Sequence, residues 1–299
     1  MGMPLLAAVA LVLAGCGSQA PPGGSTGGPP TGTSTGASSA SATGPVELVG
    51  IGTVLSVKGG PAMLCLGGVQ DSLPPGCSGP PIVGWDWAKA PTSQERGDVR
   101  WGEYAVVGHW DGTRFTLTRP ATTPEQFTGK VAPRASSGPD FTTPCPAPEG
   151  GWRVVDAAKA TDDAFAQTTT AAEHLPGFAG LWIDQPPPSS GASGSNDPTL
   201  FILNVKVTGD PSVAEAALRR TWGGKLCVSA AKRTDAELRR IMDEVTRLPG
   251  ILQAGPDVVR EVVDVHVLYD DGRLQRAMDA KYGAGVVRVT SALYPYEPR

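Results

Sequence analysis

The 299-residue chain carries 25 basic residues (Lys and Arg) and 29 acidic residues (Asp and Glu), which gives a net charge of −4. No charged residue precedes position 45, so the acidic balance belongs to the last 255 residues. This balance argues against nucleic acid as a partner, because a nucleic-acid binder needs a basic surface. A stretch of that length is long for one domain and sufficient for two.

The chain opens with an apolar run from Met3 to Ala14, which is shorter than the roughly 20 residues of a transmembrane helix. Its length is typical of a signal peptide, although no Lys or Arg precedes it. The run ends at Leu13-Ala14-Gly15-Cys16, which resembles the lipobox of bacterial lipoproteins. The resemblance implies that residues 1–15 are a signal peptide and that Cys16 is the lipidated first residue of the mature protein. The other interpretation is an ordinary signal peptide that contains a cysteine.

A low-complexity segment follows Cys16. Residues 17–44 are Gly, Ser, Thr, Pro, Ala and one Gln, with no charged and no large apolar side chain. Because such a segment buries too little apolar surface to offset the entropy of ordering, we predict that residues 16–44 form a disordered tether. The folded part is then held at the outer, extracytoplasmic face of the cell membrane through the lipid on Cys16 alone.

Four further cysteines follow the tether, an even number in a chain expected to be exported: Cys65, Cys77, Cys145 and Cys227. Two disulfides are the natural interpretation, and four cysteines allow three pairings. Cys65 and Cys77 flank a turn-rich segment, so we pair them and leave Cys145 with Cys227. A zinc site is the alternative, but no two cysteines have the C-x₂₋₄-C spacing.

The first folded unit, predicted at 45–140, consists of short apolar segments separated by Gly and Pro. Strands are expected at 46–57, 62–69, 81–87, 104–110 and 114–118, the last two flanking the hairpin signal Asp111-Gly112. No long segment has helical periodicity. This pattern predicts a small all-β barrel or sandwich.

Aromatic residues are concentrated in this unit. Trp85 and Trp87 share one face of their expected strand, and Asp86 lies on the other face. A candidate ligand platform combines these residues with others in the same unit: Trp85, Asp86, Trp87, Trp101, Tyr104, His109 and Trp110. The alternative, which we favour, is that the aromatic side chains form the core of a small all-β domain.

A connector rich in Pro and Gly, predicted at 141–151, contains Cys145 and leads to a second unit at 152–299. Strands are expected in that unit at 152–156, 180–184, 199–208, 226–228, 258–269 and 286–293. Helices are expected at 157–173, 211–222, 238–248 and 274–281, with Asp210 and Thr234 as N-caps. From the strand at 199–208 onward, strands and helices alternate in the order β-α-β-α-β-α-β. The order predicts one α/β sandwich, so the whole fold is α+β.

Catalytic and cofactor motifs were sought in both units. The three histidines, His109, His174 and His266, lack metal-ligand spacing, and no G-x-S-x-G motif is present. The glycines of Gly283-Ala284-Gly285 follow a helix, whereas those of a dinucleotide loop follow a strand. We therefore expect no cofactor and no metal.

Three blocks of the folded part carry a further resemblance: 64–80 around Cys65 and Cys77, 101–112, and Trp222-Gly223-Gly224-Lys225-Leu226-Cys227-Val228. In these blocks the chain resembles uncharacterised two-domain lipoproteins of GC-rich Gram-positive bacteria. The resemblance implies no activity and no site. A non-catalytic surface lipoprotein that binds an envelope component or a protein partner is the first hypothesis. The alternatives are a secreted hydrolase with a site between the two domains, and a structural or inhibitory module that acts through a sheet edge.

Overall fold

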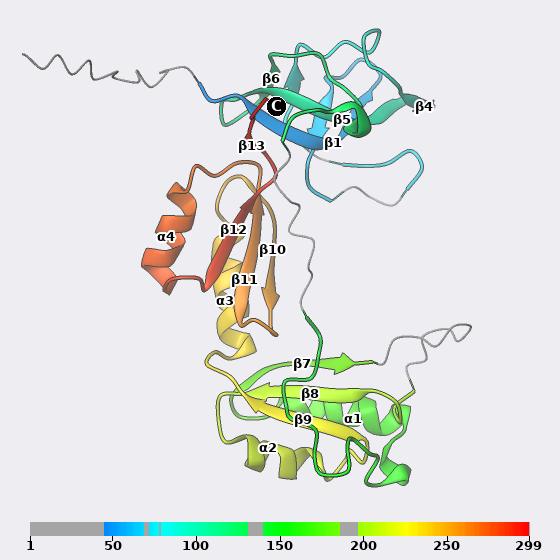
Figure 1. Cartoon of the computed structure of the whole chain (residues 1–299), viewed down its shortest axis with the longest axis vertical. Coiled ribbons are helices and arrows are strands. Elements are labelled where there is room, and N and C mark those ends of the chain that lie inside the picture. The colour runs from blue at the N-terminus through cyan, green and yellow to red at the C-terminus, as the bar shows by residue number, and fades with distance from the viewer. Residues whose placement is uncertain (1–44, 69–71, 78, 131–139, 186–196, 299) are drawn as a thin grey trace, which may run out of the picture. The chain divides into compact units, whose positions relative to one another are not determined.

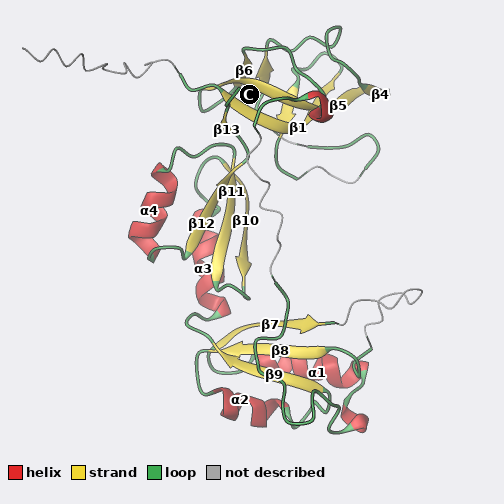
Figure 2. Ribbon diagram, viewed as in Figure 1, coloured by secondary structure: helices red, strands yellow, loops and turns green. Residues whose placement is uncertain are grey.

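The computed structural model describes residues 45–68, 72–77, 79–130, 140–185 and 197–298, and Pro45–Arg299 forms one compact unit. This part of the chain combines four α-helices with 13 strands in three sheets (Figures 1 and 2). The signal peptide, Cys16 and the tether at 16–44 lie outside the described residues, so the lipid anchor stays a prediction. None of the helices in the described ranges is long and apolar enough to cross a membrane.

Seven strands form the first sheet: β1 (Leu48–Val57), β2 (Met63–Cys65), β3 (Ile82–Val83), β4 (Gln94–Arg96), β5 (Val99–Trp110), β6 (Phe115–Leu117) and β13 (Tyr294–Pro295). β1 pairs with both β2 and β5, β5 pairs with β6, and β6 pairs with β3. A bridge between Met63 and Pro81 joins β2 to the residue before β3. The backbone pairings therefore run in a closed ring through β1, β2, β3, β6 and β5. A 3₁₀ turn, η1 (Pro124–Gln126), follows β6.

The core of the first sheet is filled by side chains from most of its strands and from one distant residue: Leu48, Val54, Leu64, Ile82, Tyr104, Val106, Phe115 and Leu293. Leu293 is fully buried there and directly precedes β13, which pairs with β1. The C-terminal end of the chain thus belongs to the first sheet, which local sequence patterns do not indicate.

Both disulfides form as predicted. Cys65 is bonded to Cys77 with a Cα–Cα distance of 6.0 Å, and Cys145 is bonded to Cys227 with a Cα–Cα distance of 5.8 Å. The predicted hairpin at Asp111-Gly112 is also confirmed. β5 and β6 pair on either side of it, and the Asp111 carboxylate accepts hydrogen bonds from the backbone N–H groups of Thr113 and Arg114.

The remaining elements form two modules of the same αββαβ order. The first module contains η2 (Ala157–Lys159), α1 (Asp162–Glu173), β7 (Phe178–Asp184), β8 (Ile202–Val207), α2 (Pro211–Leu218) and β9 (Lys225–Ala230). The second contains α3 (Asp235–Val245), β10 (Ile251–Asp257), β11 (Val262–Val267), α4 (Arg273–Tyr282) and β12 (Val287–Ser291). In each, the middle strand pairs antiparallel with the first strand and parallel with the last one.

The two modules also match in local sequence. Thr161 and Thr234, which cap α1 and α3, are 73 positions apart, and the same spacing relates Asp184 to Asp257 at the ends of β7 and β10. Leu-Pro-Gly precedes both strands, at 175–177 and 248–250. β7 and β10 each carry an irregularity near their start. The second part of the chain is therefore built from one supersecondary unit used twice.

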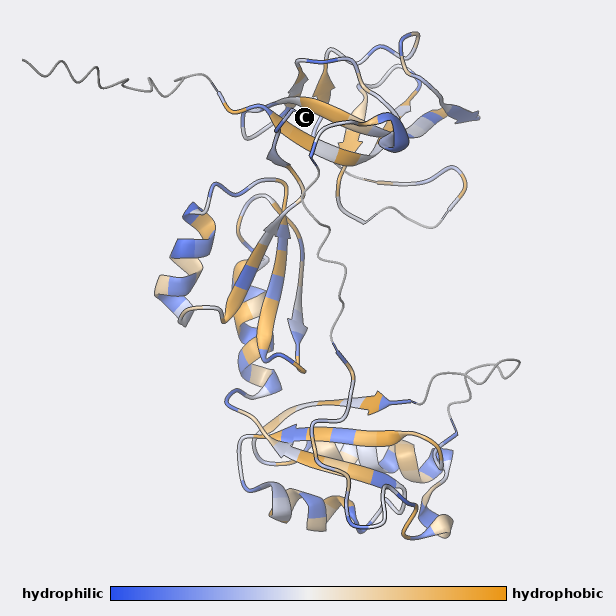
Figure 3. Cartoon of the chain, in the orientation of Figure 1, coloured by the Kyte–Doolittle hydropathy of each residue, from blue (hydrophilic) through white to orange (hydrophobic). Residues whose placement is uncertain are grey.

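In both modules the two helices cover one face of the sheet. Hydrophobic residues alternate with polar ones along β8 and β11 (Figure 3), so each middle strand turns a purely apolar side to its helices. In the first module, Leu203, Val205 and Val207 pack with residues of α1 and α2. In the second, Val263 and Val265 pack with residues of α3 and α4.

The opposite face of the first module is covered by residues 140–145, here called the strap. The indole Nε1 of Trp182 donates to the carbonyl of Phe141 at 3.0 Å, and the backbone N–H of Thr143 donates to the Asp184 carboxylate at 2.8 Å. The Cys145–Cys227 disulfide completes the attachment. As a result Trp182 is only 6% exposed.

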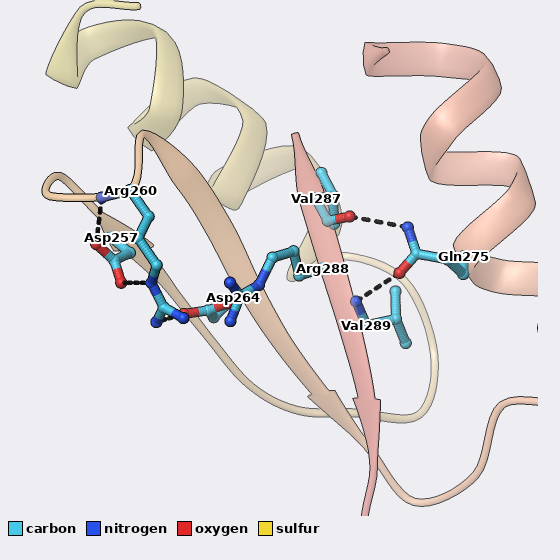
Figure 4. Close-up of polar contacts among 7 residues, drawn as sticks. All are labelled: Asp257, Arg260, Asp264, Gln275, Val287, Arg288 and Val289. Atoms are coloured by element: carbon cyan, nitrogen blue, oxygen red, sulfur yellow. Dashed lines mark hydrogen bonds and ion pairs between the residues drawn. The ribbon is translucent and has the colours of Figure 1, made fainter. Parts of the chain in front are cut away.

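The corresponding face of the second module carries charged residues. Arg260 contacts Asp257 and Asp264, and Arg288 contacts Asp264 at 3.0 Å (Figure 4). On the outer edge of β12, the amide of Gln275 donates to the carbonyl of Val287 at 2.9 Å. The same amide accepts from the N–H of Val289 at 2.8 Å (Figure 4). Gln275 thereby occupies the hydrogen-bonding groups that a neighbouring strand would use.

Three expectations for the second unit are wrong. One sheet was expected, but the structure has two sheets of three strands. Residues 152–156 are not a strand, and the N–H groups of Val155 and Asp156 donate to the carbonyl of Gly223 instead. The apolar stretch expected as one strand at 258–269 begins with a turn, because Asp257 accepts hydrogen bonds from Arg260, and β11 starts only at Val262.

Candidate functional site

A cavity of about 590 Å³ lies at one end of the first sheet, between the end of β1, the start of β5 and the segment after β3. Two residues of the predicted platform, Trp85 and Trp87, line it. We call it the Trp87 cavity. Its volume is in the range of small-molecule sites, which is roughly 300–1,000 Å³. The charged residues in its wall are Lys58, Glu95, Asp98 and Arg100.

A tight turn and a backbone hydrogen bond shape this cavity. β4 and β5 pair from Arg96 opposite Val99, so only Gly97 and Asp98 connect them. Gly97 has a φ of +60°, a conformation that favours glycine and suits a two-residue hairpin turn. The backbone N–H of Lys58 donates to the Asp98 carbonyl at 2.7 Å, which fixes the end of β1 to this hairpin.

The floor of the cavity is an aromatic cluster. The ring of Trp85 meets that of Trp87 at 5.1 Å and that of Tyr104 at 4.8 Å between centroids, both edge to face. Tyr104 is fully buried, its hydroxyl donates to the Thr92 carbonyl, and burial raises its pKa. Such pairs contribute roughly 0.5–1.5 kcal/mol beyond their buried area, so the two indoles are held in place.

The two indole N–H groups differ in their partners. Trp87 Nε1 donates to the Ser56 hydroxyl at 2.9 Å. Trp85 Nε1 is buried and has no hydrogen-bond partner among the described residues. A buried donor without an acceptor costs about 1–3 kcal/mol, so this group needs a water molecule or a ligand atom as its acceptor.

Arg100 forms part of the wall. Its guanidinium lies 5.1 Å from the centroid of the Trp87 ring, a cation–π contact. Its Nε and Nη2 donate to the Ser93 hydroxyl at 3.0 and 2.9 Å. Because the guanidinium has five N–H donors in a fixed plane, the remaining donors are oriented without being used by the described residues.

The charges around the cavity balance in number. Lys58 and Arg100 carry positive charge, and Glu95 and Asp98 carry negative charge. None of the four belongs to an ion pair with another residue of the described ranges. The rim therefore offers both donors and acceptors that are not neutralised by one another.

The remaining platform residues do not line the Trp87 cavity. Asp86 is exposed and accepts from the N–H of Ala88, and this hydrogen bond, followed by one from Lys89, lowers the pKa of Asp86. Trp101 is 9% exposed and packs with Leu55 and the Cys65–Cys77 disulfide.

His109 and Trp110 are also elsewhere. The Nδ1 of His109 lies 3.2 Å from the Val46 carbonyl, and Trp110 packs against the main core of the first sheet. Trp85, Trp87 and Trp110 thus pack against one core, while Trp101 packs in another.

Two smaller cavities, of about 320 and 270 Å³, share Gln94, Gly102 and Glu103 in their walls. The Glu103 carboxylate accepts from the buried hydroxyl of Thr53. Their one aromatic wall residue is the buried Trp101, so they offer little aromatic surface.

The other histidines lie away from acidic clusters. His174 contacts the Thr170 carbonyl at 2.7 Å, and His266 is exposed on β11. Within the described ranges, no group of three or more His, Cys, Asp or Glu residues could hold a metal ion.

Comparison with known proteins assigns no family and no function to the chain. No protein-family model matches the chain, and no curated protein matches it. Function is therefore argued from the Trp87 cavity and the N-terminal sequence.

Sequence reasoning missed the four charged wall residues, Lys58, Glu95, Asp98 and Arg100. The signal that could have found three of them is Gly97-Asp98, a pair typical of two-residue hairpins. It was hidden because the flanking residues are charged. All three residues of β4 are exposed, so they need not alternate between apolar and polar.

Proposed function

We propose that this protein is a lipid-anchored lipoprotein at the outer face of a bacterial cell membrane, where it binds an envelope component without catalysis. The observation that carries the binding proposal is the Trp87 cavity, with its aromatic floor and unneutralised charges. A cavity with these features is the usual location of a ligand in a small domain.

The anchor part of the proposal rests on the sequence Leu13-Ala14-Gly15-Cys16 and the uncharged segment 17–44. A flexible chain of that length has a root-mean-square reach of roughly 30 Å. The folded part could thus reach envelope material beyond the membrane surface. The two disulfides agree with an oxidising, extracytoplasmic location.

The domain organisation belongs to the same proposal. We propose that residues 45–140 are a small β-barrel domain that carries the cavity, and that 141–151 is a connector. We assign the two modules, within residues 152–291, to the α/β sandwich part, in which the helices of each module pack on its own sheet, and we assign Leu293 and β13 to the barrel. The closed ring of backbone pairings supports the first part, and the cores of the two modules support the last.

Neither alternative has a supporting observation of its own. A hydrolase with a serine or cysteine nucleophile needs a base beside that nucleophile, whereas the described contacts of His109 and His174 are to backbone carbonyls. Partner pairing at a sheet edge is opposed in the second module at both edges. Pro256 lacks an N–H on β10, and Gln275 occupies the edge of β12 (Figure 4).

The test uses the full chain and compares cell fractions with binding. Cys16→Ala should move the protein from the membrane fraction to the soluble fraction, and tight membrane association of this variant would contradict the anchor. For binding, the purified Cys16→Ala chain, which has no lipid to carry it into membranes, is incubated with isolated envelopes and sedimented, and the variants below are made in this background. Arg100→Ala should reduce co-sedimentation about ten-fold.

Arg114→Ala is the matched control for Arg100→Ala. Arg114 directly precedes β6 of the same sheet, its side chain is 59% exposed, and among the described residues its ion-pair partner is Asp111 beside the β5–β6 turn. It should bind envelopes like the parent. Equal binding by the Arg100 and Arg114 variants would show that the Trp87 cavity is not the binding site.

A further inference from the structure

The Trp87 cavity restricts the chemistry of its ligand in three ways, the first of which is its aromatic floor. Trp85 and Trp87 are each half-buried, so part of each indole faces the cavity. The two indoles stand edge to face and Arg100 lies over the Trp87 ring, so the indole surface left for a ligand is apolar but limited in area. Covering it removes apolar area from water, so the ligand must present some apolar surface of its own.

The second restriction is the balance of charge. Lys58 and Arg100 would repel a cation, and Glu95 and Asp98 would repel a dense anion such as a polyphosphate. An uncharged ligand meets no such opposition. It can use the same four groups as hydrogen-bond donors and acceptors, and hydrogen bonds to charged groups are stronger than those between neutral groups.

The third restriction is that donors and acceptors are both present and oriented. Arg100 is fixed against Trp87 and Ser93, so its remaining N–H groups are oriented donors. The carboxylates of Glu95 and Asp98 accept only. A ligand that suits all of these needs groups that both donate and accept at several positions around one ring, which is the property of a hydroxyl.

We propose that the ligand of the Trp87 cavity is an uncharged saccharide segment of an envelope polymer, an inference that rests on the proposed binding function. A pyranose ring has an apolar face of C–H groups and a rim of hydroxyls. It places its C–H face against the indoles, and its hydroxyls bond to Arg100, Lys58 and the two carboxylates. The cavity volume of about 590 Å³ leaves room for water to bridge the remaining groups.

The experiment measures binding of the full chain in detergent to a panel of uncharged oligosaccharides of glucose, mannose, galactose, arabinose and N-acetylglucosamine. Calorimetry gives the affinity, and tryptophan fluorescence reports on the cavity. At least one sugar should bind, and its affinity should change less than two-fold between low and high salt because no net charge is neutralised. Polyglycerol phosphate serves as the anionic comparison.

Two rim variants connect binding to the cavity. Arg100→Ala and Lys58→Ala lie outside the core, so they leave the fold intact, and each should weaken sugar binding about ten-fold or more. Arg114→Ala should bind sugar like the parent. A loss of sugar binding in Trp87→Ala alone would not connect binding to the cavity. Trp87 also packs against the core, so its replacement can disturb the fold.

The outcomes separate the two proposals. Sugar binding that is lost in both rim variants supports the saccharide assignment. If envelopes bind in a manner that depends on Arg100 but no sugar of the panel binds, or if polyglycerol phosphate binds in a salt-sensitive way, the saccharide assignment is overturned and the binding function stands. If envelopes do not bind at all, both proposals are overturned.

Discussion

The two αββαβ modules have the same strand order and the same helix-covered face, yet they treat the opposite face of the sheet differently. In the first module that face bears Trp182, Asn204 and Cys227, each at most 6% exposed beneath the strap. In the second it bears Asp264 and Arg288, whose side chains are 27% and 43% exposed. The face under the strap thus bears uncharged residues, whereas the other module's face bears charged ones. This difference is expected because a charged side chain is costly to bury.

The comparison indicates how the strap is held. Thr143 Oγ1 in the strap, and Asn204 Oδ1 and Ser229 Oγ on the sheet, are buried without hydrogen-bond partners among the described residues. Such groups cost free energy unless water satisfies them, so the strap does not owe its place to complementary polar contacts alone. Phe141 adds little burial, because it is 51% exposed. The covalent bond to Cys227 is therefore the principal attachment.

The two modules also contact one another through a largely buried ion pair. Lys206 on β8 reaches the Glu261 carboxylate at 3.0 Å and the Val259 carbonyl at 2.7 Å. Burial acts to raise the pKa of Glu261, but hydrogen bonds from the Lys232 N–H and from Lys206 outweigh it and lower the pKa overall. The turn between β10 and β11 is thus joined to the sheet of the first module.

The largest expected effect comes from removing the strap's covalent bond. Replacing Cys145 and Cys227 with Ser should lower the free energy of unfolding by roughly 2–5 kcal/mol, because the unfolded chain loses the constraint of a long loop. Hydrogen exchange should increase first at residues 140–151, while α3 of the second module keeps its protection.

The double replacement of Cys65 and Cys77 with Ser is the control for this experiment. That disulfide joins residues of the first sheet, so its loss should leave exchange at 140–151 unchanged. Unaltered protection of the strap in the Cys145 and Cys227 variant would mean that other contacts order it.

An intermediate effect is expected at the edge of β12. Gln275→Ala leaves the Val287 carbonyl and the Val289 N–H without their partner, which should cost about 1–3 kcal/mol in chemical denaturation. The freed edge should also promote self-association, measurable by light scattering.

The first module supplies the matched control. Counting from the equivalent residues Asp210 and Asp270, Gln275 corresponds to Glu215, which pairs with Arg219. Glu215→Ala should change stability by less than about 0.5 kcal/mol. A loss as large as that of Gln275→Ala would mean that the helix position matters in both modules and that edge capping does not explain it.

The smallest effect is a pH dependence confined to the second module. Hydrogen bonds from Lys281 and Tyr282, with a further one from Arg240, lower the pKa of Glu244 from 4.5 to about 2. A lowered pKa means that the folded state favours the charged form. This stabilisation is present above about pH 4.5 and is lost as the pH falls toward 2.

Thermal unfolding over that pH range tests this dependence. The parent should lose stability on acidification more steeply than Glu244→Gln, and the two should converge near pH 2. The first module has Ala171 at the corresponding position, so Glu173→Gln on α1 is the control and should run parallel to the parent. If stability falls with pH equally steeply in Glu244→Gln and in the parent, the role of this carboxylate is contradicted.

Much of the local structure could be predicted because its causes are local. Asp210 and Thr234 cap their helices through side chains that accept from the backbone of the first turn, as predicted. The helix expected from 157 starts only at Asp162, because Thr161 caps it there and residues 157–159 form a 3₁₀ turn. Asp111 forms its turn through the same chemistry as the caps. Alternation along β8 and the short spacing of Cys65 and Cys77 are local as well, and Cys145–Cys227 follows because those two cysteines remain.

The elements that were missed depend on distant partners. β10 contains Gly255 and Pro256 and has no clear alternation, so only its pairing with β11 makes it a strand. β4 is fully exposed and exists through its hairpin with β5, while β13 is defined by its pairing with β1. The same dependence hid half of the candidate site. Trp85 and Trp87 stood out as aromatic residues, but Arg100 and Lys58 became wall residues only when β1 and β5 met.

By itself the sequence determined the caps of α2 and α3, the hairpin turn, the Cys65–Cys77 disulfide and the apolar faces, because each follows from side-chain chemistry over a few residues. The pairing of Cys145 with Cys227 followed because only these two cysteines remained. Tertiary structure decided that the second part of the chain forms two sheets, and that its last residues complete the first sheet. It also decided which tryptophans line a cavity and which are buried in a core. The physical reason is that strand pairing joins residues far apart in the chain. The free energy of such pairing depends on register and on shared burial, which no local pattern contains.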